Sequence, residues 1–109
     1  MYLENFSNLD DVVREFQISE KDVEGIAVLL AIYTYEDYDG SAFVLFERNN
    51  KLYEVNGGHC SCYGLEGQWE PEKTSVEALR HRIVNGYFGG TYQYDYRNEL
   101  QLVLNKWEW

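Results

Sequence analysis

One stretch of the chain, residues 25–56, decides the fold: GIAVLLAIYTYEDYDGSAFVLFERNNKLYEVN. Its first part, Ile26 to Tyr35, is long and rich in branched and aromatic residues, a composition typical of a buried strand. Ala42 to Arg48 alternates apolar and aromatic residues, as a second strand would, and Lys51 to Asn56 follows with further apolar and aromatic residues. The stretch therefore predicts a three-stranded antiparallel meander.

Two short polar segments connect these strands. Glu36 to Gly40 ends in an Asp-Gly step, which favours a turn, and Asn49 with Asn50 forms a second turn. Tight connections of this kind join strands that pair as neighbours.

A helix is expected before the meander. Ser7 is a candidate N-cap, Asp10 falls in the first turn, and apolar residues then recur at helical spacing. These apolar residues are Leu9, Val12, Val13 and Phe16. The remaining face of this helix is acidic, and a polar connection, residues 17–24, leads into the meander.

Two further helices are expected after the meander. Thr74-Ser75-Val76-Glu77 has the form of a capping box and predicts a helix from about Thr74 to Asn85. The C-terminal segment fits two patterns. Leu100, Val103, Leu104 and Trp107 have helical spacing, whereas Leu100, Leu102 and Leu104 fit a strand. We favour the helix.

These elements predict a single α+β domain spanning residues 1–109. It combines a three-stranded antiparallel meander with two or three helices. The expected strands and helices do not alternate along the chain, as they would in a βαβ fold. A chain of 109 residues is ordinary for one domain.

The chain is strongly acidic. Nine basic and nineteen acidic side chains give a formal net charge of −10. Direct binding to nucleic acid is therefore not expected, because it depends on clustered lysine and arginine. A partner with a basic surface is the functional interpretation, and simple solubility is the alternative. No segment has the features of a membrane span or a secretory signal, so we expect a cytosolic protein.

The segment Gly57 to Pro71 is expected to be an irregular loop. It holds His59, Cys60 and Cys62, and with His81 these residues raise the question of a zinc site or a Cys-His catalytic pair. The spacing is tighter than in familiar zinc sites, and acidic surroundings raise a thiol pKa. We therefore expect no metal, no cofactor and no enzymatic activity, and we interpret the segment as a shaped, tightly packed loop.

Aromatic residues, 17% of the chain, outnumber what a core of this size needs. Tyrosine and tryptophan are enriched in binding hot spots, and neighbouring carboxylates would steer a basic partner. The alternative is that these rings pack on the sheet. The predicted partner-binding residues are Tyr35, Glu36, Asp37, Tyr38, Asp39, Tyr63, Glu66, Trp69 and Glu70.

The string HCSCYGLEGQWEPE, residues 59–72, followed by the capped helix through Ile83, resembles small accessory proteins encoded by bacteriophages. This resemblance covers about a quarter of the chain. It implies a setting in the host cytoplasm, where small acidic phage proteins bind and disable host defence proteins, as anti-CRISPR and anti-restriction proteins do. It assigns no catalytic residue.

The leading hypothesis is a non-enzymatic phage inhibitor. It would bind a host protein or ribonucleoprotein with a basic surface and would partly mimic nucleic-acid charge. The second hypothesis is a module that sequesters a nucleotide or another small ligand, with Tyr63 and Trp69 as an aromatic pocket and Arg80, His81 and Arg82 as the positive groups. A zinc- or thiol-dependent enzyme is the third hypothesis.

Overall fold

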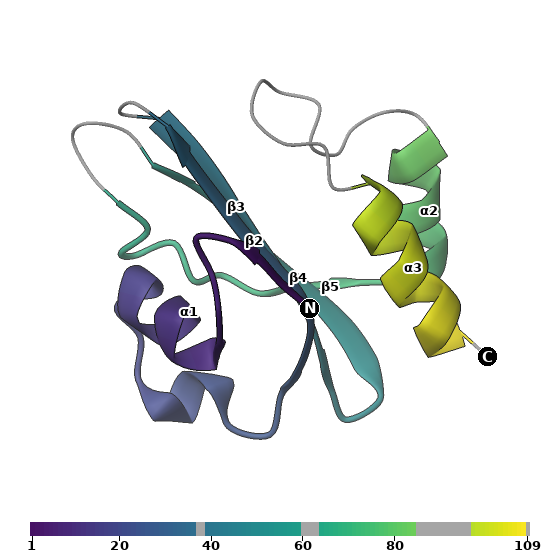
Figure 1. Ribbon diagram of the computed structural model, residues 1–109. Coiled ribbons are helices and arrows are strands. Elements are labelled where there is room, and N and C mark those ends of the chain that lie inside the picture. The colour runs from purple at the N-terminus through teal and green to yellow at the C-terminus, as the bar shows by residue number, and fades with distance from the viewer. Residues whose placement is uncertain (37–38, 60–63, 85–96, 109) are drawn as a thin grey trace.

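The computed structural model describes residues 1–36, 39–59, 64–84 and 97–108. Within these ranges a five-stranded sheet has helices on both faces, so the predicted α+β class is confirmed (Figure 1). The elements are β1 Tyr2–Glu4, α1 Leu9–Phe16, η1 Glu20–Val23, β2 Ala27–Glu36, β3 Asp39–Arg48, β4 Lys51–His59, β5 Glu72–Thr74, α2 Val76–Val84 and α3 Arg97–Glu108.

The sheet has the strand order β1-β2-β3-β4-β5. The predicted meander forms its centre, because β2, β3 and β4 pair antiparallel along nearly their whole lengths. The sheet has two strands beyond the predicted meander: β1 pairs parallel to β2, and β5 pairs antiparallel to β4. A strand–helix–strand unit is therefore present as well, since α1 lies between β1 and its parallel neighbour β2. Each added strand has three residues, too few to display a period.

The connections of the meander are tighter than the sequence indicated. Asn49 and Asn50 form the predicted β3–β4 turn, with φ angles of 55° and 66° that asparagine tolerates well. Glu36 pairs with Asp39, so Asp39 and Gly40 belong to β3 rather than to the turn. Residues 37 and 38 lie outside the described ranges.

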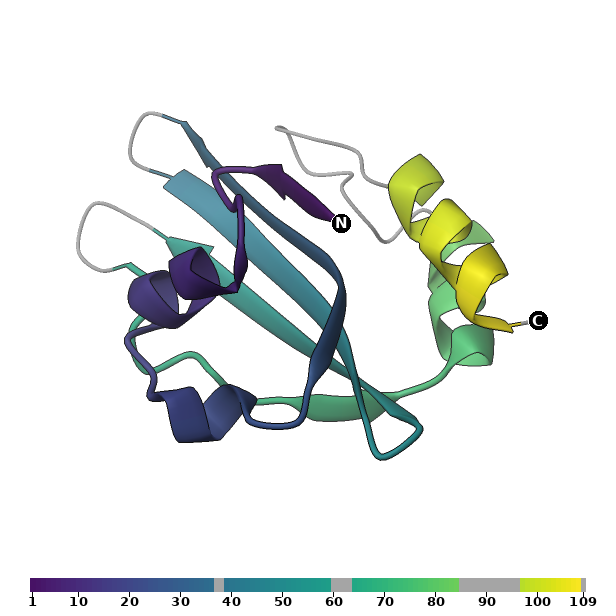
Figure 2. The ribbon, with the colours of Figure 1, turned by 60° about the horizontal axis from the view of Figure 1, so that its bottom comes forward.

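Alternate residues of the central strands supply two cores, one on each face of the sheet. Leu30, Ile32, Phe43 and Leu45 pack with α2 and α3. Their neighbours in sequence face α1, and this second core contains Ala31, Tyr33, Ala42, Val44, Phe46, Val55, Phe6, Val12, Phe16 and Leu65. Figure 2 shows α1 and η1 on one side of the sheet and the α2–α3 pair on the other. Both faces of the meander are therefore buried.

The helix boundaries shift slightly from those expected. Asn8, not Ser7, is the N-cap of α1, and Asp10 lies in its first turn as predicted. The second helix begins at Val76 because Ser75 Oγ accepts a hydrogen bond from the Ala78 N–H at 3.1 Å, the geometry of an N-cap.

Thr74 therefore belongs to β5 and not to the second helix. Asn85, the expected end of that helix, lies beyond the described residues. The C-terminal segment is helical over Arg97–Glu108, which confirms the helix and excludes the strand.

Candidate functional site

The segment from Gly57 to Pro71 is only partly a loop. Residues 57–59 extend β4, residues 60–63 are not described, and the chain then returns beside the end of β4. There the Gln68 side chain takes the place of a neighbouring strand: Oε1 accepts from the Gly58 N–H at 2.8 Å and Nε2 donates to the Gly58 carbonyl at 2.7 Å. The Gln68 amide also donates to the Gly64 carbonyl at 2.7 Å. One amide side chain thus links Gly64, at the start of the returning segment, to Gly58 of β4.

Trp69 anchors the returning segment to the α1 side of the sheet. Its ring stacks on Phe46, with centroids 5.8 Å apart and planes 10° apart, and meets Phe16 edge-on at 5.2 Å. Only part of the indole is left exposed. Of the two alternatives for the aromatic residues, packing on the sheet describes Trp69, and the role of this ring in partner binding stays a prediction.

Close packing around Gly57 leads to a testable expectation. A Cβ at this position would lie 3.1 Å from Leu65 Cδ2, 3.3 Å from Gln68 Oε1 and 3.4 Å from Phe16 Cε1. We expect Gly57→Ala to lower the free energy of unfolding by about 1 to 2 kcal/mol, because well-packed neighbours must shift. Urea denaturation followed by circular dichroism would measure it.

Gly58→Ala is the matched control for this substitution. Among the described atoms, only the Gly40 carbonyl oxygen would lie within 4.0 Å of its added Cβ. Equal stability of the two variants would contradict the crowding at Gly57.

The predicted partner-binding residues do not all lie at one end of the sheet: Glu36 and Asp39 pair where β2 and β3 meet, whereas Trp69 stacks on Phe46, six residues beyond Gly40 along β3. Gly40 pairs with His59, so the first residues of β3 lie beside the last residue of β4. The predicted residues Asp37, Tyr38 and Tyr63 are outside the described ranges. For Tyr35, Glu36 and Asp39 the structure describes the backbone alone. Glu66 and Glu70 have exposed side chains on either side of the Trp69 anchor.

A larger group of carboxylates lies on the α1 side of the molecule, and we call it the acidic face. It consists of Asp10, Glu15, Glu20, Asp22, Glu24, Glu66 and Glu70, which are exposed or half-exposed. The basic residues on the same side are Arg14, Lys21 and Arg48. Arg48 is engaged locally, since Nη2 donates to the Asp22 carbonyl at 3.0 Å and the guanidinium lies 5.7 Å from the Phe46 ring centroid. The face therefore keeps an excess of negative charge.

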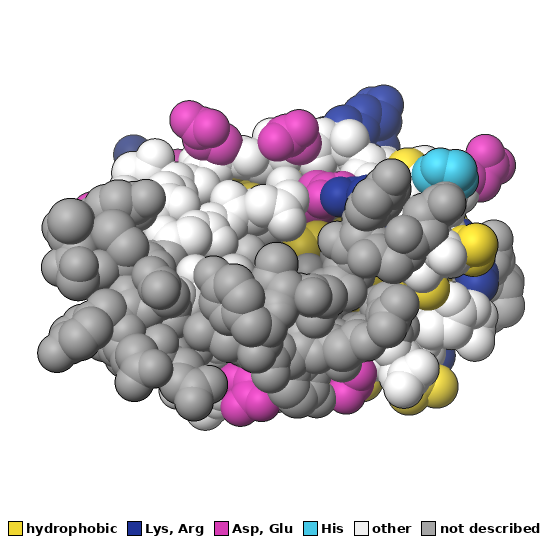
Figure 3. All heavy atoms as spheres, turned by 90° about the horizontal axis from the view of Figure 1, so that it is seen from above, with side chains coloured by type: hydrophobic (Ala, Val, Ile, Leu, Met, Phe, Trp, Pro, Cys, Tyr) yellow, Lys and Arg dark blue, Asp and Glu magenta, His cyan; other side chains and the backbone are white. Residues whose placement is uncertain are grey.

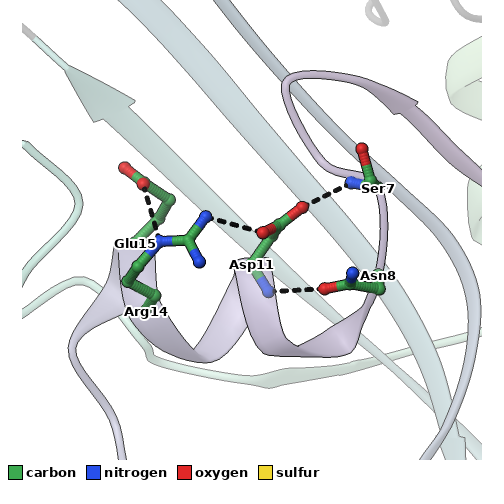
Figure 4. Close-up of polar contacts among 5 residues, drawn as sticks. All are labelled: Ser7, Asn8, Asp11, Arg14 and Glu15. Atoms are coloured by element: carbon green, nitrogen blue, oxygen red, sulfur yellow. Dashed lines mark hydrogen bonds and ion pairs between the residues drawn. The ribbon is translucent and has the colours of Figure 1, made fainter.

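The first turn of α1 holds part of this face in place (Figure 4). Asn8 Oδ1 accepts from the Asp11 N–H at 2.9 Å, and Asp11 Oδ2 accepts in return from the Ser7 N–H at 2.8 Å. Asp11 Oδ1 accepts from Arg14 at 2.6 Å, and Glu15 lies 3.7 Å from the same guanidinium. The Ser7 hydrogen bond first, and Arg14 next, lower the pKa of Asp11. Arg14 is thus held by local carboxylates.

Positive charge gathers on the other side of the sheet. In Figure 3, acidic side chains are visible in both halves of the molecule, whereas most visible Lys and Arg side chains lie in the half that contains α2 and α3. Two arginines there have partners: Arg82 forms an ion pair with the buried Glu54, and Arg80 donates to Asn105 Oδ1 at 2.9 Å. The charge distribution of the chain is therefore asymmetric across the sheet.

Tyr63 of the proposed nucleotide pocket lies outside the described residues, and among those described Trp69 is not brought together with Arg82. Trp69 packs in the core on the α1 side, whereas Arg82 reaches Glu54 on the side of α2 and α3. Glu54 shares its strand face with Leu52, two residues away, which belongs to the α2–α3 core. Trp69 and Arg82 therefore lie on opposite faces of the sheet.

The suggested metal or thiol site falls largely outside the described residues, since Cys60 and Cys62 are not placed and only the backbone of His59 is described. Within the described ranges, no group of three or more His, Cys, Asp or Glu side chains is arranged to hold a metal ion. His81 is exposed on α2. The described helices include none with the length and apolar character of a membrane span.

Comparison with protein-family models, with curated protein sequences and with solved structures finds no match to this chain. The site is therefore defined by its own geometry: an anchored acidic face on one side of the sheet and a more basic surface on the other.

Proposed function

We propose that this protein is a non-enzymatic inhibitor that binds the basic surface of a host defence protein or ribonucleoprotein through the acidic face. In this proposal it is a bacteriophage product, acts in the host cytoplasm, and partly mimics the charge of the nucleic acid that the defence protein binds. Its closest functional analogues would be anti-CRISPR and anti-restriction proteins.

The observation that carries the proposal is the gathering of exposed carboxylates on one side of the sheet. They come from α1 with the adjacent η1 and from the distant 64–70 segment, and α1 and this segment share one core. Because Trp69 and Gln68 fasten the 64–70 segment to the sheet, Glu66 and Glu70 are carried on a fixed support. A pre-ordered charged surface loses less conformational entropy on binding than a mobile one.

The charge of the whole chain supports the same mode of binding. A net charge of −10 on 109 residues creates a field that accelerates encounter with a basic surface and disfavours nucleic acid as the direct partner. Such binding weakens as salt rises, because exposed charges are screened beyond about 10 Å at 0.1 M ionic strength.

The proposal is tested by inhibition of purified defence nucleases. A CRISPR–Cas nuclease and a restriction endonuclease, each with a fluorescent DNA substrate, are titrated with the protein in gel-shift and cleavage assays. We expect stoichiometric loss of DNA binding by a target nuclease, and relief of that loss at high salt. Glu66→Lys combined with Glu70→Lys should weaken inhibition about tenfold, through repulsion of the basic surface.

Glu72→Lys combined with Glu77→Lys is the matched control. These carboxylates are also exposed but lie on β5 and α2, and their replacement changes the net charge equally. Inhibition that falls equally in both double variants would reject the acidic face as the binding surface. Inhibition by far less than one equivalent of protein would indicate turnover and reject a non-enzymatic mechanism.

A further inference from the structure

Two pockets on the side of the sheet away from the acidic face both have Trp107 in their lining. One, of about 430 Å³, lies between α3 and the start of β2, and its apolar lining includes Val28, Leu29 and Leu102. The other, of about 460 Å³, lies beside β4, β5 and the start of α2. We call the two together the Trp107 groove. Each volume is in the range of pockets that hold ligands.

The apolar half of the groove exposes surface that the fold does not cover. Leu102 is 56% exposed on α3, although the adjacent Val103 and Leu104 are buried in the core. Met1, at 43% exposed, lies in the same pocket. Two of the three exposed large apolar side chains among the described residues therefore line this one groove, and the third is Val84.

The charges of the groove are opposite in sign to those of the chain as a whole. Lys106 lines the apolar half, and Lys51 and Lys73 line the other half. The sequence has four lysines, so all except Lys21 are found here. Among the described lining residues Glu77 is the single carboxylate.

We propose that the Trp107 groove binds an acidic peptide segment that carries large apolar side chains. Apolar groups of the peptide occupy the pocket beside Leu102, and its carboxylates pair with the lysines at the two ends. β2, which lines the first pocket, and β5, which lines the second, are three strand spacings apart in the sheet, which corresponds to roughly 14 Å. A peptide of about four extended residues spans that distance, whereas a ligand with one anionic group reaches only one end.

Fluorescence anisotropy with a short fluorescein-labelled peptide of alternating glutamate and leucine tests this proposal. We expect saturable binding to the full chain, and at least tenfold weaker binding when lysine replaces glutamate or serine replaces leucine in the peptide. Leu102→Glu should weaken binding at least tenfold, because it places a carboxylate in the apolar pocket. Lys51→Glu combined with Lys73→Glu should weaken it about tenfold by repulsion.

Val84→Glu and Lys21→Glu are the matched controls, since Val84 and Lys21 are exposed and outside the groove. Both should bind the peptide as the unmodified protein does. Equal losses in Leu102→Glu and Val84→Glu would overturn the proposal, as would absence of saturable binding. Circular dichroism of each variant confirms that the fold is kept.

Other occupants are distinguished in the same experiments. If sodium decanoate displaces the peptide and binds with the same affinity as the peptide, one anionic group is sufficient. This result would overturn the peptide assignment. Sedimentation that shows a dimer, dissociated by Leu102→Glu, would assign the groove to a second copy of the chain instead. Glu66→Lys with Glu70→Lys should leave peptide binding unchanged. The proposal for the groove and the proposal for the acidic face are therefore tested independently.

Discussion

Replacing Phe46 with alanine is expected to lower the free energy of unfolding by about 3 to 5 kcal/mol, the largest loss that we predict for this chain. Phe46 is 1% exposed and lies between two other rings: Tyr53 stacks at 5.5 Å and Trp69 at 5.8 Å between centroids. Removing the ring leaves a cavity and releases the anchor of the 64–70 segment. Urea denaturation followed by circular dichroism measures the change.

A double-mutant cycle with Trp69→Ala separates the ring contact from the cavity. The Phe46–Trp69 pair is expected to show a coupling of about 0.5 to 1.5 kcal/mol, the range for aromatic pairs. Additive losses would mean that Trp69 does not depend on Phe46 for its position. A loss below about 1 kcal/mol for Phe46→Ala alone would contradict the packing on the α1 side.

The same variants connect stability with function. If Trp69 serves mainly as an anchor, Trp69→Ala lowers both stability and inhibition, and a lower temperature restores much of the inhibition. If its exposed edge contacts the partner, inhibition stays low even where the variant is fully folded. The inhibition assay at two temperatures distinguishes these roles.

The centre of the sheet was predictable because its strands are long and buried on both faces. Residues 26–35 and 42–48 are almost continuously apolar, and the Asn49-Asn50 pair marks the turn between the second and third strands. The edge strands were not predictable. Tyr2–Glu4 and Glu72–Thr74 are defined by pairing with a distant strand, and three residues carry no periodicity of their own.

The candidate site, like the sheet, could be predicted only in part from the sequence. The acidic surface of α1 could be predicted from helical periodicity. Packing of the aromatic rings on the sheet, which describes Trp69, was one of the two alternatives that the sequence offered. What no local pattern revealed is that Glu66 and Glu70 lie on the α1 side. That placement depends on the Gln68 side chain joining the end of β4, a contact between residues ten apart.

A buried ion pair was the polar feature of the fold that the sequence analysis missed. Glu54 is 6% exposed and pairs with Arg82 of α2. It occupies an inward position two residues after the buried Leu52, where an apolar residue is the usual choice. A carboxylate in such a position, followed later by a helix rich in arginine, is the signal that could have indicated the pair.

The surroundings of Glu54 favour its charged form. Burial, the strongest single influence, opposes ionisation, but hydrogen bonds from Arg82, Asn56 and Thr74 together with the charge of Arg82 outweigh it. The pKa of Glu54 is therefore lowered from the ordinary value of 4.5. A lowered folded-state pKa contributes stability above the pKa of the unfolded chain, and this contribution is lost as the pH falls through the folded-state pKa.

Arg82→Met is therefore expected to destabilise the protein by about 2 to 3 kcal/mol at pH 7, less than a fully buried pair because the Arg82 side chain is 30% exposed. Methionine keeps the apolar stem but leaves Glu54 without its cation, so burial then raises the pKa of Glu54. The stability difference from the unmodified protein should shrink as the pH falls from 7 to about 3.5, because protonation removes the uncompensated charge. Urea denaturation at several pH values measures this stability difference.

Lys21→Met, which removes an exposed positive charge, is the control, and its stability difference from the unmodified protein should not shrink in this way as the pH falls. A difference that stayed constant with pH would mean that Arg82 stabilises the sheet by packing alone and that the buried carboxylate does not depend on it.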